Sequence, residues 1–227
     1  MEKRKKILII GNGHYGGKPY GTLIDDTDYF EKIIRLSWYQ LDEESKKFIG
    51  SRTDINSTIW WKYREEYKGN DLILVNNLPK YTIDEMNDAY RKTILTQRYD
   101  NLQSRLENAG RIIYAHNIND DDEIREFFHK NLNSTDKIKK VINDSGCNFS
   151  LGFRTLFIAT KIFPDHDIYT HCIDFFTAKR ETGGYYWAPQ HNRHRANRHP
   201  YIYEKMCFEK LVKSKVLYKL NSVSNVQ

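Results

Sequence analysis

An apolar run near the start of the chain, followed at once by a glycine-rich turn, restricts the available folds more than any other feature. Residues Ile7 to Ile10 are all Ile or Leu, and Gly-Asn-Gly-His-Tyr-Gly-Gly begins at Gly11. A strand that is apolar on both faces is typical of a parallel sheet covered by helices on both sides. We therefore predict a buried first strand over 6–10.

The glycines of this turn allow the backbone to approach a ligand closely, as phosphate-binding loops require. Gly11, Gly13 and Gly16 also match the dinucleotide-binding pattern Gly-x-Gly-x-x-Gly. That pattern requires a helix directly after it, whereas Lys-Pro-Tyr-Gly follows from Lys18. The turn is therefore either a nucleotide-binding turn or simply a tight one, and the pattern alone does not decide between them.

Apolar runs alternate with helical patterns along the rest of the chain, which predicts an α/β fold with a mostly parallel sheet flanked by helices. A length of 227 residues suits a single domain over 1–227 with a sizeable core. We expect further strands over 29–36, 55–61, 71–75, 111–115, 168–176 and 216–220. We expect helices over 83–109, 120–132, 136–142, 150–163 and 199–213, an irregular loop over 177–198 and a polar tail over 221–227.

Composition excludes several classes of protein. The formal net charge of +6 is spread along the chain and falls short of a nucleic-acid-binding signature, so we expect no nucleic-acid partner. Three widely spaced cysteines predict neither a disulfide framework nor a structural zinc site, and they favour a reducing compartment. Only four apolar residues follow the basic N-terminus, too few for a signal peptide or a membrane span. We expect a soluble cytoplasmic protein, or one that contacts a membrane peripherally through its basic face.

Short motifs occur in a definite order along the chain. The first group is Ile7–Gly13, Gly21–Asp25, Asp28, Ile34–Arg35 and Phe48–Asp54; the second runs from Ser150–Gly152 to Ile173–Phe175; the third is Tyr185–Tyr186, then His199 and Glu204. Together they resemble the motifs of the sialyltransferase-type glycosyltransferases, the related animal and bacterial groups that use CMP-activated sugars. The resemblance covers these regions and leaves the middle of the chain unmatched.

The resemblance implies a Rossmann-like nucleotide-sugar glycosyltransferase domain in which 177–198 is a lid loop. It implies transfer of sialic acid, or a related 2-keto acid, from a CMP-activated donor to a glycan hydroxyl, with no metal and no further cofactor. Tyr185 and Tyr186 would hydrogen-bond the departing phosphate, and His199 would be the general base. The implied donor-binding residues are Gly11, Asn12, Gly13, Arg35, Ser37, Ser150, Gly152 and Asp174.

The sequence departs from the family pattern at two positions. Ser37 stands where the family has Asn, and Leu151 stands where it has a hydroxyl residue that approaches the donor sugar. We therefore expect a donor sugar other than N-acetylneuraminic acid. Animal relatives also carry a membrane anchor and a disulfide, and the sequence shows neither, which favours a bacterial or viral setting.

The residue types suit this chemistry. A histidine titrates near neutrality and can take the proton of an attacking hydroxyl, which contributes roughly 10²–10⁴ in rate. Paired tyrosine hydroxyls and a basic loop can stabilise the CMP leaving group without a metal. Attack from the face opposite the leaving group predicts inversion. Glu204 lies five residues after His199, too far round a helix for a reliable side-chain pair, so we expect it to hold the loop or an acceptor.

Other interpretations of these residues stay open. Asp165-His166-Asp167 would be the Asp-x-Asp of a metal-dependent nucleotide-sugar transferase, although it precedes a strand, whereas ligands gather where strands end. The basic and aromatic segment 185–203 would contact single-stranded nucleic acid. Residues 119–123 would hold a divalent cation or begin a solvated helix, and the solvated helix is favoured. A zinc site is the least favoured alternative, with the ligands His191, His194 and His199.

Overall fold

The computed structural model describes residues 4–13, 15, 18–36, 39, 41–59, 71–75, 111–115, 120–144, 149–175 and 200–220. Its elements are β1 (Lys5–Ile10), α1 (Gly21–Asp25), β2 (Lys32–Leu36), α2 (Glu43–Ile49), β3 (Ile55–Ile59), β4 (Asp71–Val75), β5 (Arg111–Ala115), α5 (Asp120–Leu132), α6 (Asp136–Asp144), α7 (Leu151–Ile162), β6 (His166–His171), α8 (Tyr201–Lys213) and β7 (Leu217–Lys219). The expected helix over 83–109 and the tail over 221–227 lie outside the described residues.

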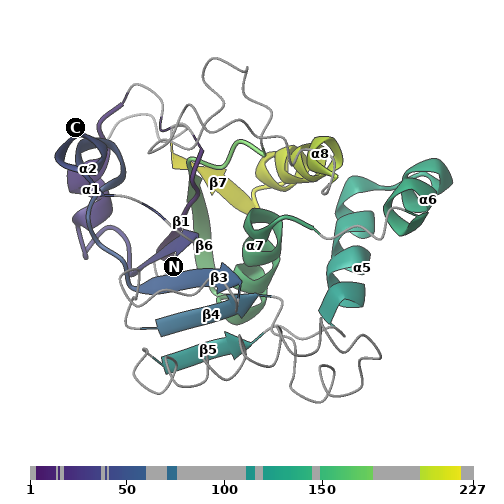
Figure 1. The fold of residues 1–227 in the computed structure, drawn as a ribbon, viewed down its shortest axis with the longest axis horizontal. Coiled ribbons are helices and arrows are strands. Elements are labelled where there is room, and N and C mark those ends of the chain that lie inside the picture. Colours follow the sequence, from purple (N-terminus) through teal and green to yellow (C-terminus); the bar gives the residue numbers. More distant parts are fainter. Residues whose placement is uncertain are drawn as a thin grey trace, which may run out of the picture.

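The strands form one seven-stranded sheet in the order β5-β4-β3-β2-β1-β6-β7 (Figure 1). Every neighbouring pair in this sheet is parallel. The chain first builds outward from β1 to β5, and it then returns to place β6 on the other side of β1. The strand order therefore reverses between β1 and β6, and in open α/β sheets ligands bind in the crevice at such a point.

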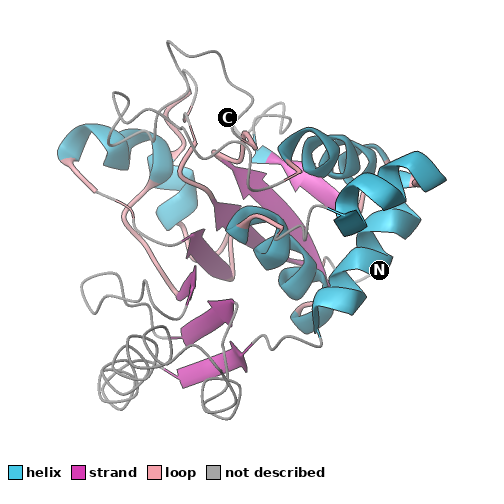
Figure 2. Ribbon diagram, turned by 45° about the vertical axis from the view of Figure 1, so that its right-hand side comes forward, coloured by secondary structure: helices cyan, strands magenta, loops and turns pink. Residues whose placement is uncertain are grey.

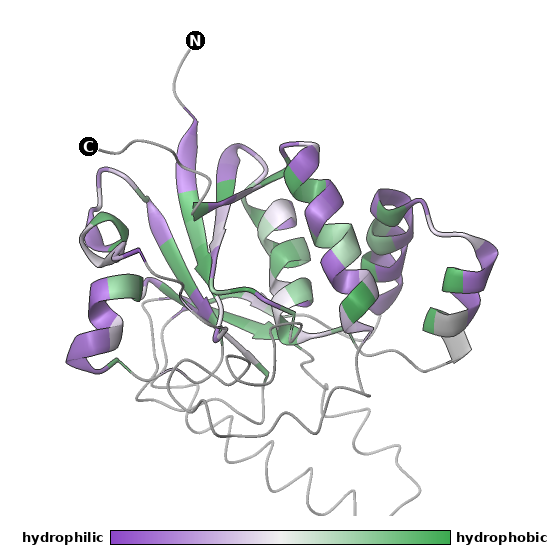
Figure 3. Ribbon diagram, turned by 90° about the horizontal axis from the view of Figure 1, so that it is seen from above, coloured by the Kyte–Doolittle hydropathy of each residue, from purple (hydrophilic) through white to green (hydrophobic). Residues whose placement is uncertain are grey.

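Helices cover both faces of the sheet (Figures 1 and 2). On one face, Ile7 and Ile9 join a core cluster with side chains of α5, α7 and α8. On the other face, Leu8 and Ile10 join a second cluster with side chains of α1 and α2. Hydrophobic strands accordingly lie inside the molecule and hydrophilic residues on the outer helix surfaces (Figure 3). The prediction of a first strand buried on both faces is confirmed.

Several predicted boundaries are confirmed and others are wrong. The strands over 71–75 and 111–115 and the helix over 120–132 occur as predicted. Ser150 caps α7, as predicted. The second strand begins at Lys32 instead of at residue 29, because Asp26 accepts a hydrogen bond from the N–H of Asp28 and forms a turn there.

The strand predicted over 168–176 occupies His166–His171 instead. It ends early because Cys172 and Phe175 adopt left-handed backbone conformations, with φ of 56° and 50°. The last strand is also shorter than predicted, spanning Leu217–Lys219. Among the described helices, none combines the length and the apolar character needed to cross a membrane.

Two helices were missed by the sequence patterns. The first, α1, has five residues, too few to show a periodicity. The second, α2, does have sequence signals: Asp42 accepts a hydrogen bond from Ser45 N at its start, and Gly50 with φ 64° follows its end. These cap residues are typical of helix termini.

Candidate functional site

The loops that leave β1 and β6 are packed directly against each other. Gly11 N donates to His171 O and Gly13 N donates to Cys172 O, both at 2.8 Å. A Cβ atom at Gly11 would lie 2.3 Å from Cys172 O, and one at Gly13 would lie 2.7 Å from the same atom. Any side chain at either position would push the two loops apart. Both glycines are therefore required by the close approach of the two loops at the strand-order reversal.

Asp174 is held beside this glycine turn. A Cβ at Gly13 would lie 2.9 Å from the carboxyl carbon of Asp174. The residues on either side of the Ile173–Asp174 pair, Cys172 and Phe175, have positive φ, and strained backbone of this kind clusters at functional sites. Phe175 anchors the loop by packing on Phe208 of α8, with ring centroids 5.2 Å apart. The strained loop thus places the carboxylate at the edge of the crevice.

Asn12 lies on the other side of the same turn, towards β2. Its Nδ2 donates to Leu36 O at 3.0 Å, and because a carbonyl can only accept, this bond sets the orientation of the amide. The other amide atom, Oδ1, is buried and has no hydrogen-bond partner among the described residues. Asn12 therefore retains an acceptor whose partner would have to be an N–H or O–H group.

The N-terminus of α7 lies next to Asn12. The nearest atom to a Cβ built on Gly152 is Leu36 Cδ1 at 3.6 Å, so Asn12 and Gly152 both reach Leu36. The structure thus brings together Asn12, Gly152, Ser150 and Asp174 at the carboxyl ends of β2, β1 and β6. The positive end of the α7 dipole lies at this edge, where it favours an anion.

Ser150 joins this helix start to α8. The N–H of Ser150 donates to Glu204 Oε1 at 2.7 Å, and its hydroxyl donates to Glu204 Oε2 at 2.7 Å. The same hydroxyl accepts a hydrogen bond from Phe153 N at 3.2 Å. Glu204 therefore holds the N-cap of α7, where the sequence analysis expected it to hold the loop or an acceptor.

Glu204 is fully buried. Burial raises the pKa of its carboxyl to about 7, although the two hydrogen bonds from Ser150 and the nearby Arg154 oppose this rise. Arg154 is itself buried and pairs with Asp121 of α5. The starts of α7 and α8 and the first turn of α5 are thus connected by buried polar contacts.

Arg35 is directed to the opposite face of the sheet. Its Nη2 donates to Ile49 O at 2.7 Å and to Gly50 O at 2.9 Å, and its Nε donates to Arg52 O at 3.0 Å. Side chains alternate along a strand, and the flanking Ile34 and Leu36 face α7. The structure therefore does not bring the Arg35 side chain together with Asn12 and Gly152. The Arg35 guanidinium instead holds the C-terminus of α2.

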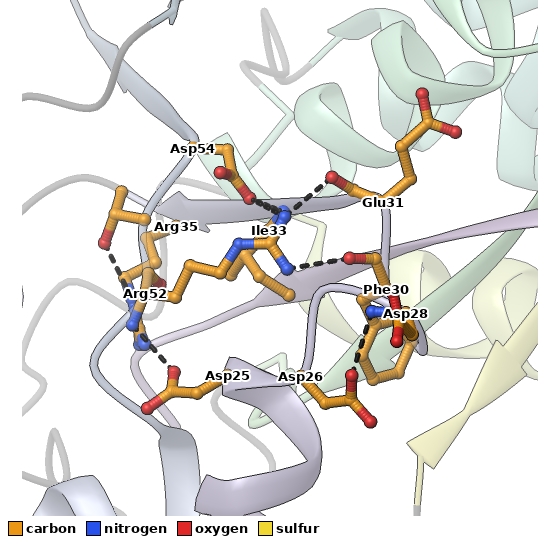
Figure 4. A network of polar contacts seen from close by, with 10 residues as sticks. Asp25, Asp26, Asp28, Phe30, Glu31, Ile33, Arg35, Arg52 and Asp54 are labelled. Atoms are coloured by element: carbon orange, nitrogen blue, oxygen red, sulfur yellow. Dashed lines mark hydrogen bonds and ion pairs between the residues drawn. The ribbon is translucent and has the colours of Figure 1, made fainter.

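Other residues of the first motif group also hold the scaffold together (Figure 4). Asp25 accepts hydrogen bonds from the N–H groups of Ser51 and Arg52, both at 2.8 Å. Arg52 donates to the carbonyls of Phe30 and Glu31, both at 2.7 Å. These contacts tie α1 and the turn before β2 to the loop after α2, and they explain this part of the motif without a ligand.

Sequence patterns did not single out His171, at the end of β6. Its side chain is buried, and burial lowers its pKa to about 4, so the ring is neutral near pH 7. The ring of Tyr20 meets it edge-on, with centroids 5.5 Å apart. His171 therefore belongs to the packed support of the crevice.

The acidic start of α5 and the Asp-x-Asp sequence can also be placed. Asp121, Asp122 and Glu123 each form an ion pair, with Arg154, Arg125 and Lys161 respectively. Asp165 and Asp167 lie at the start of β6, where the strands begin, which is the opposite end of the sheet from the strand-order reversal. Arg4 donates to Asp165 O at 3.2 Å and pairs with the Asp167 carboxylate. Asp165 and Asp167 therefore lie away from the strand-order reversal, at the other end of β6.

The remaining predicted site residues lie outside the described part of the chain. They are Ser37, Tyr185, Tyr186 and His199, together with the predicted lid loop 177–198 and its histidines His191 and His194. Pro200, which follows His199, is described and immediately precedes α8.

Neither the protein-family models nor the curated proteins contain a match to this sequence. Solved structures do. Two crystal structures of a mammalian sialyltransferase, one of them in complex with Gal-beta-1-3GalNAc-ortho-nitrophenol, each superimpose with a TM-score of 0.56. Each match covers 96% of this chain and 69% of that chain, at 13% sequence identity. The protein therefore has the Rossmann-like α/β fold of the sialyltransferases.

Proposed function

We propose that the protein is a sialyltransferase-like glycosyltransferase. It transfers sialic acid, or a related 2-keto sugar acid, from a CMP-activated donor to a hydroxyl group of a glycan. The observation that carries the proposal is the gathering of Asn12, Gly152 and Asp174 at the carboxyl ends of the strands, where the strand order reverses. Ligands of open α/β sheets bind at this position, and the fold matches that of enzymes of this class.

The crevice suits a nucleotide phosphate ester. The positive end of α7 attracts a phosphate group, and Gly152 places no side chain at the second position of that helix. Asn12 Oδ1, which has no partner in the described part of the chain, is an acceptor, so it suits an amino or hydroxyl group of the nucleoside better than a phosphate oxygen. These features support binding of the donor in an orientation with its phosphate towards α7.

The catalytic roles rest on the resemblance to the family. His199 acts as the general base that takes the proton of the acceptor hydroxyl, and Tyr185 and Tyr186 stabilise the departing phosphate without a metal. Attack opposite the leaving group inverts the anomeric carbon. The Glu204–Ser150 contact supports this assignment, because it fixes the start of α8, which follows His199, to the helix start at the crevice.

The donor sugar differs from N-acetylneuraminic acid in this proposal. Leu151 occupies the position of a family hydroxyl residue, and its side chain packs against the large core cluster. It therefore cannot donate a hydrogen bond to the sugar. A donor with fewer polar substituents at that point, still activated by CMP, fits the change.

One set of measurements tests the proposal. CMP should bind with and without a chelator, and a panel of CMP-activated and other nucleotide-activated sugars should identify one donor that releases CMP when a glycan is present. His199→Ala should abolish transfer and leave CMP affinity nearly unchanged, whereas His129→Ala on α5 should retain transfer. Activity that is lost on chelation, or retained in His199→Ala, would contradict the assigned mechanism. Absence of CMP binding would refute the proposed function.

A further inference from the structure

A cavity lies between the loop after β6, α8 and the end of β7. Its volume is about 290 Å³. Figure 1 shows α8 and β7 next to each other at this side of the sheet. The cavity is lined by Ile173, Asp174, Phe175, Lys205, Phe208, Glu209 and Lys219. Only Asp174 among these was expected at a binding site from the sequence.

The lining combines hydrogen-bond donors, acceptors and an apolar wall. Lys205 and Lys219 supply ammonium donors, and Asp174 and Glu209 supply carboxylate acceptors. Phe175 and Phe208 pack together, and the Lys219 ammonium lies 5.4 Å from the centroid of the Phe208 ring. The formal charges of the four ionisable side chains cancel. The cavity therefore does not select for net charge.

This chemistry favours a sugar ring over a phosphate. Sugar hydroxyl groups donate to carboxylates and accept from ammonium groups, and the C–H face of the ring can lie on apolar side chains. A phosphate has almost only hydrogen-bond acceptors, and its negative charge would be repelled by the two carboxylates. The volume is at the lower limit for small-molecule pockets, roughly 300–1,000 Å³, which suits one monosaccharide unit.

The position of the cavity connects it to the crevice. Asp174 lines the cavity, and its carboxyl carbon would lie 2.9 Å from a Cβ at Gly13, in the glycine turn. A ligand in the cavity would therefore lie next to a donor in the crevice, as the two substrates of a group transfer must. We propose that the cavity binds a sugar unit of the acceptor glycan, an inference that rests on the proposed function.

Binding of neutral sugars to the whole protein, without donor, tests this proposal. Ligand-observed NMR with methyl β-D-galactoside and with lactose at millimolar concentrations should detect binding. Lys219→Met and Glu209→Gln should each weaken it about tenfold, because the first removes a charged donor and the second replaces a charged acceptor with a neutral amide. Lys213→Met, at the exposed end of α8, is the matched control and should bind as the wild type does.

The outcomes separate this proposal from the proposed function. Sugar binding that both cavity variants retain, or no binding of either sugar, would overturn the acceptor-site proposal. Inorganic phosphate that binds more tightly than the sugars and displaces them would also overturn it, because the cavity would then be an anion site. CMP binding is measured on the same samples. Retention of CMP binding in Lys219→Met and Glu209→Gln with loss of sugar binding supports both proposals. Absence of CMP binding, with sugar binding retained in the wild type, refutes the proposed function and leaves the sugar-binding site.

Discussion

The buried Glu204 should make the stability of this protein depend on pH in a way that one substitution removes. Its carboxyl has an ordinary pKa of 4.5, and burial raises it to about 7 in the fold. Between these values the native state binds more protons than the unfolded state, so stability falls as pH rises. The two pKa values differ by about 2.5, and about 1.4 kcal/mol per pH unit converts this into about 3 kcal/mol.

Replacement by glutamine keeps the size and hydrogen-bonding capacity of the side chain and removes the titration. We expect the stability of the wild type relative to Glu204→Gln to fall by about 3 kcal/mol between pH 4.5 and pH 7, and then to level off. Urea unfolding at a series of pH values, with the midpoint and slope fitted at each, measures this difference. Glu126→Gln, at an exposed position of α5, is the control and should follow the wild type throughout.

A pH dependence of the opposite sign would refute the prediction for Glu204. If the wild type gained stability relative to Glu204→Gln as pH rose, the hydrogen bonds from Ser150 and the charge of Arg154 would outweigh burial. A difference that stays constant from pH 4.5 to pH 8 would show that Glu204 does not change its protonation state on folding.

Three further substitutions distinguish residues that stabilise the fold from residues that bind the donor. Gly152→Ala should leave the free energy of unfolding unchanged or raise it by about 0.5–1 kcal/mol, because the new Cβ would lie 3.6 Å from its nearest neighbour and alanine favours helices. CMP affinity measured by calorimetry should fall about tenfold. An unchanged affinity would remove Gly152 from the donor site. Gly13→Ala should lower the free energy of unfolding, measured by thermal denaturation, by about 1–3 kcal/mol, because the new Cβ would lie 2.7 Å from Cys172 O. Wild-type stability in this variant would show that the two loops can separate freely. Asp25→Ala should lower the free energy of unfolding by about 1 kcal/mol, because it removes the hydrogen bonds from Ser51 and Arg52, and it should leave CMP affinity unchanged. A selective loss of CMP binding would place Asp25 in the donor site.

Local sequence patterns predicted most of the element types. The run Leu72–Val75 is apolar throughout and is buried throughout, so pattern and burial agree. Ser150 followed by apolar residues at helical spacing predicted α7 together with its cap. Boundaries were wrong where backbone conformation, and not hydrophobicity, ends an element. The apolar residues after His171 continue the strand pattern, but the positive φ of Cys172 turns the chain away.

The candidate site could be predicted only in part. The glycine turn and the start of α7 were recognised because each is a contiguous motif. Arg35 was grouped with them because it adjoins the motif in sequence, and the alternation of side chains along β2 directs it to the other face. The cavity lined by Lys205 and Lys219 has no sequence signature, since these lysines come from a helix and a strand and resemble any solvated pair.

The sequence by itself determined that this chain is an α/β protein with a buried first strand, a glycine turn and a capped helix before β6. These features follow from interactions between residues close in the chain, which burial periodicity and capping express directly. The tertiary structure decided what those features do. Glu204 meets Ser150 across 54 residues, and Gly13 meets Cys172 and Asp174, because the reversal of strand order between β1 and β6 brings distant segments to one edge of the sheet. Side-chain pairing across such distances depends on the path of the chain, which no local pattern contains.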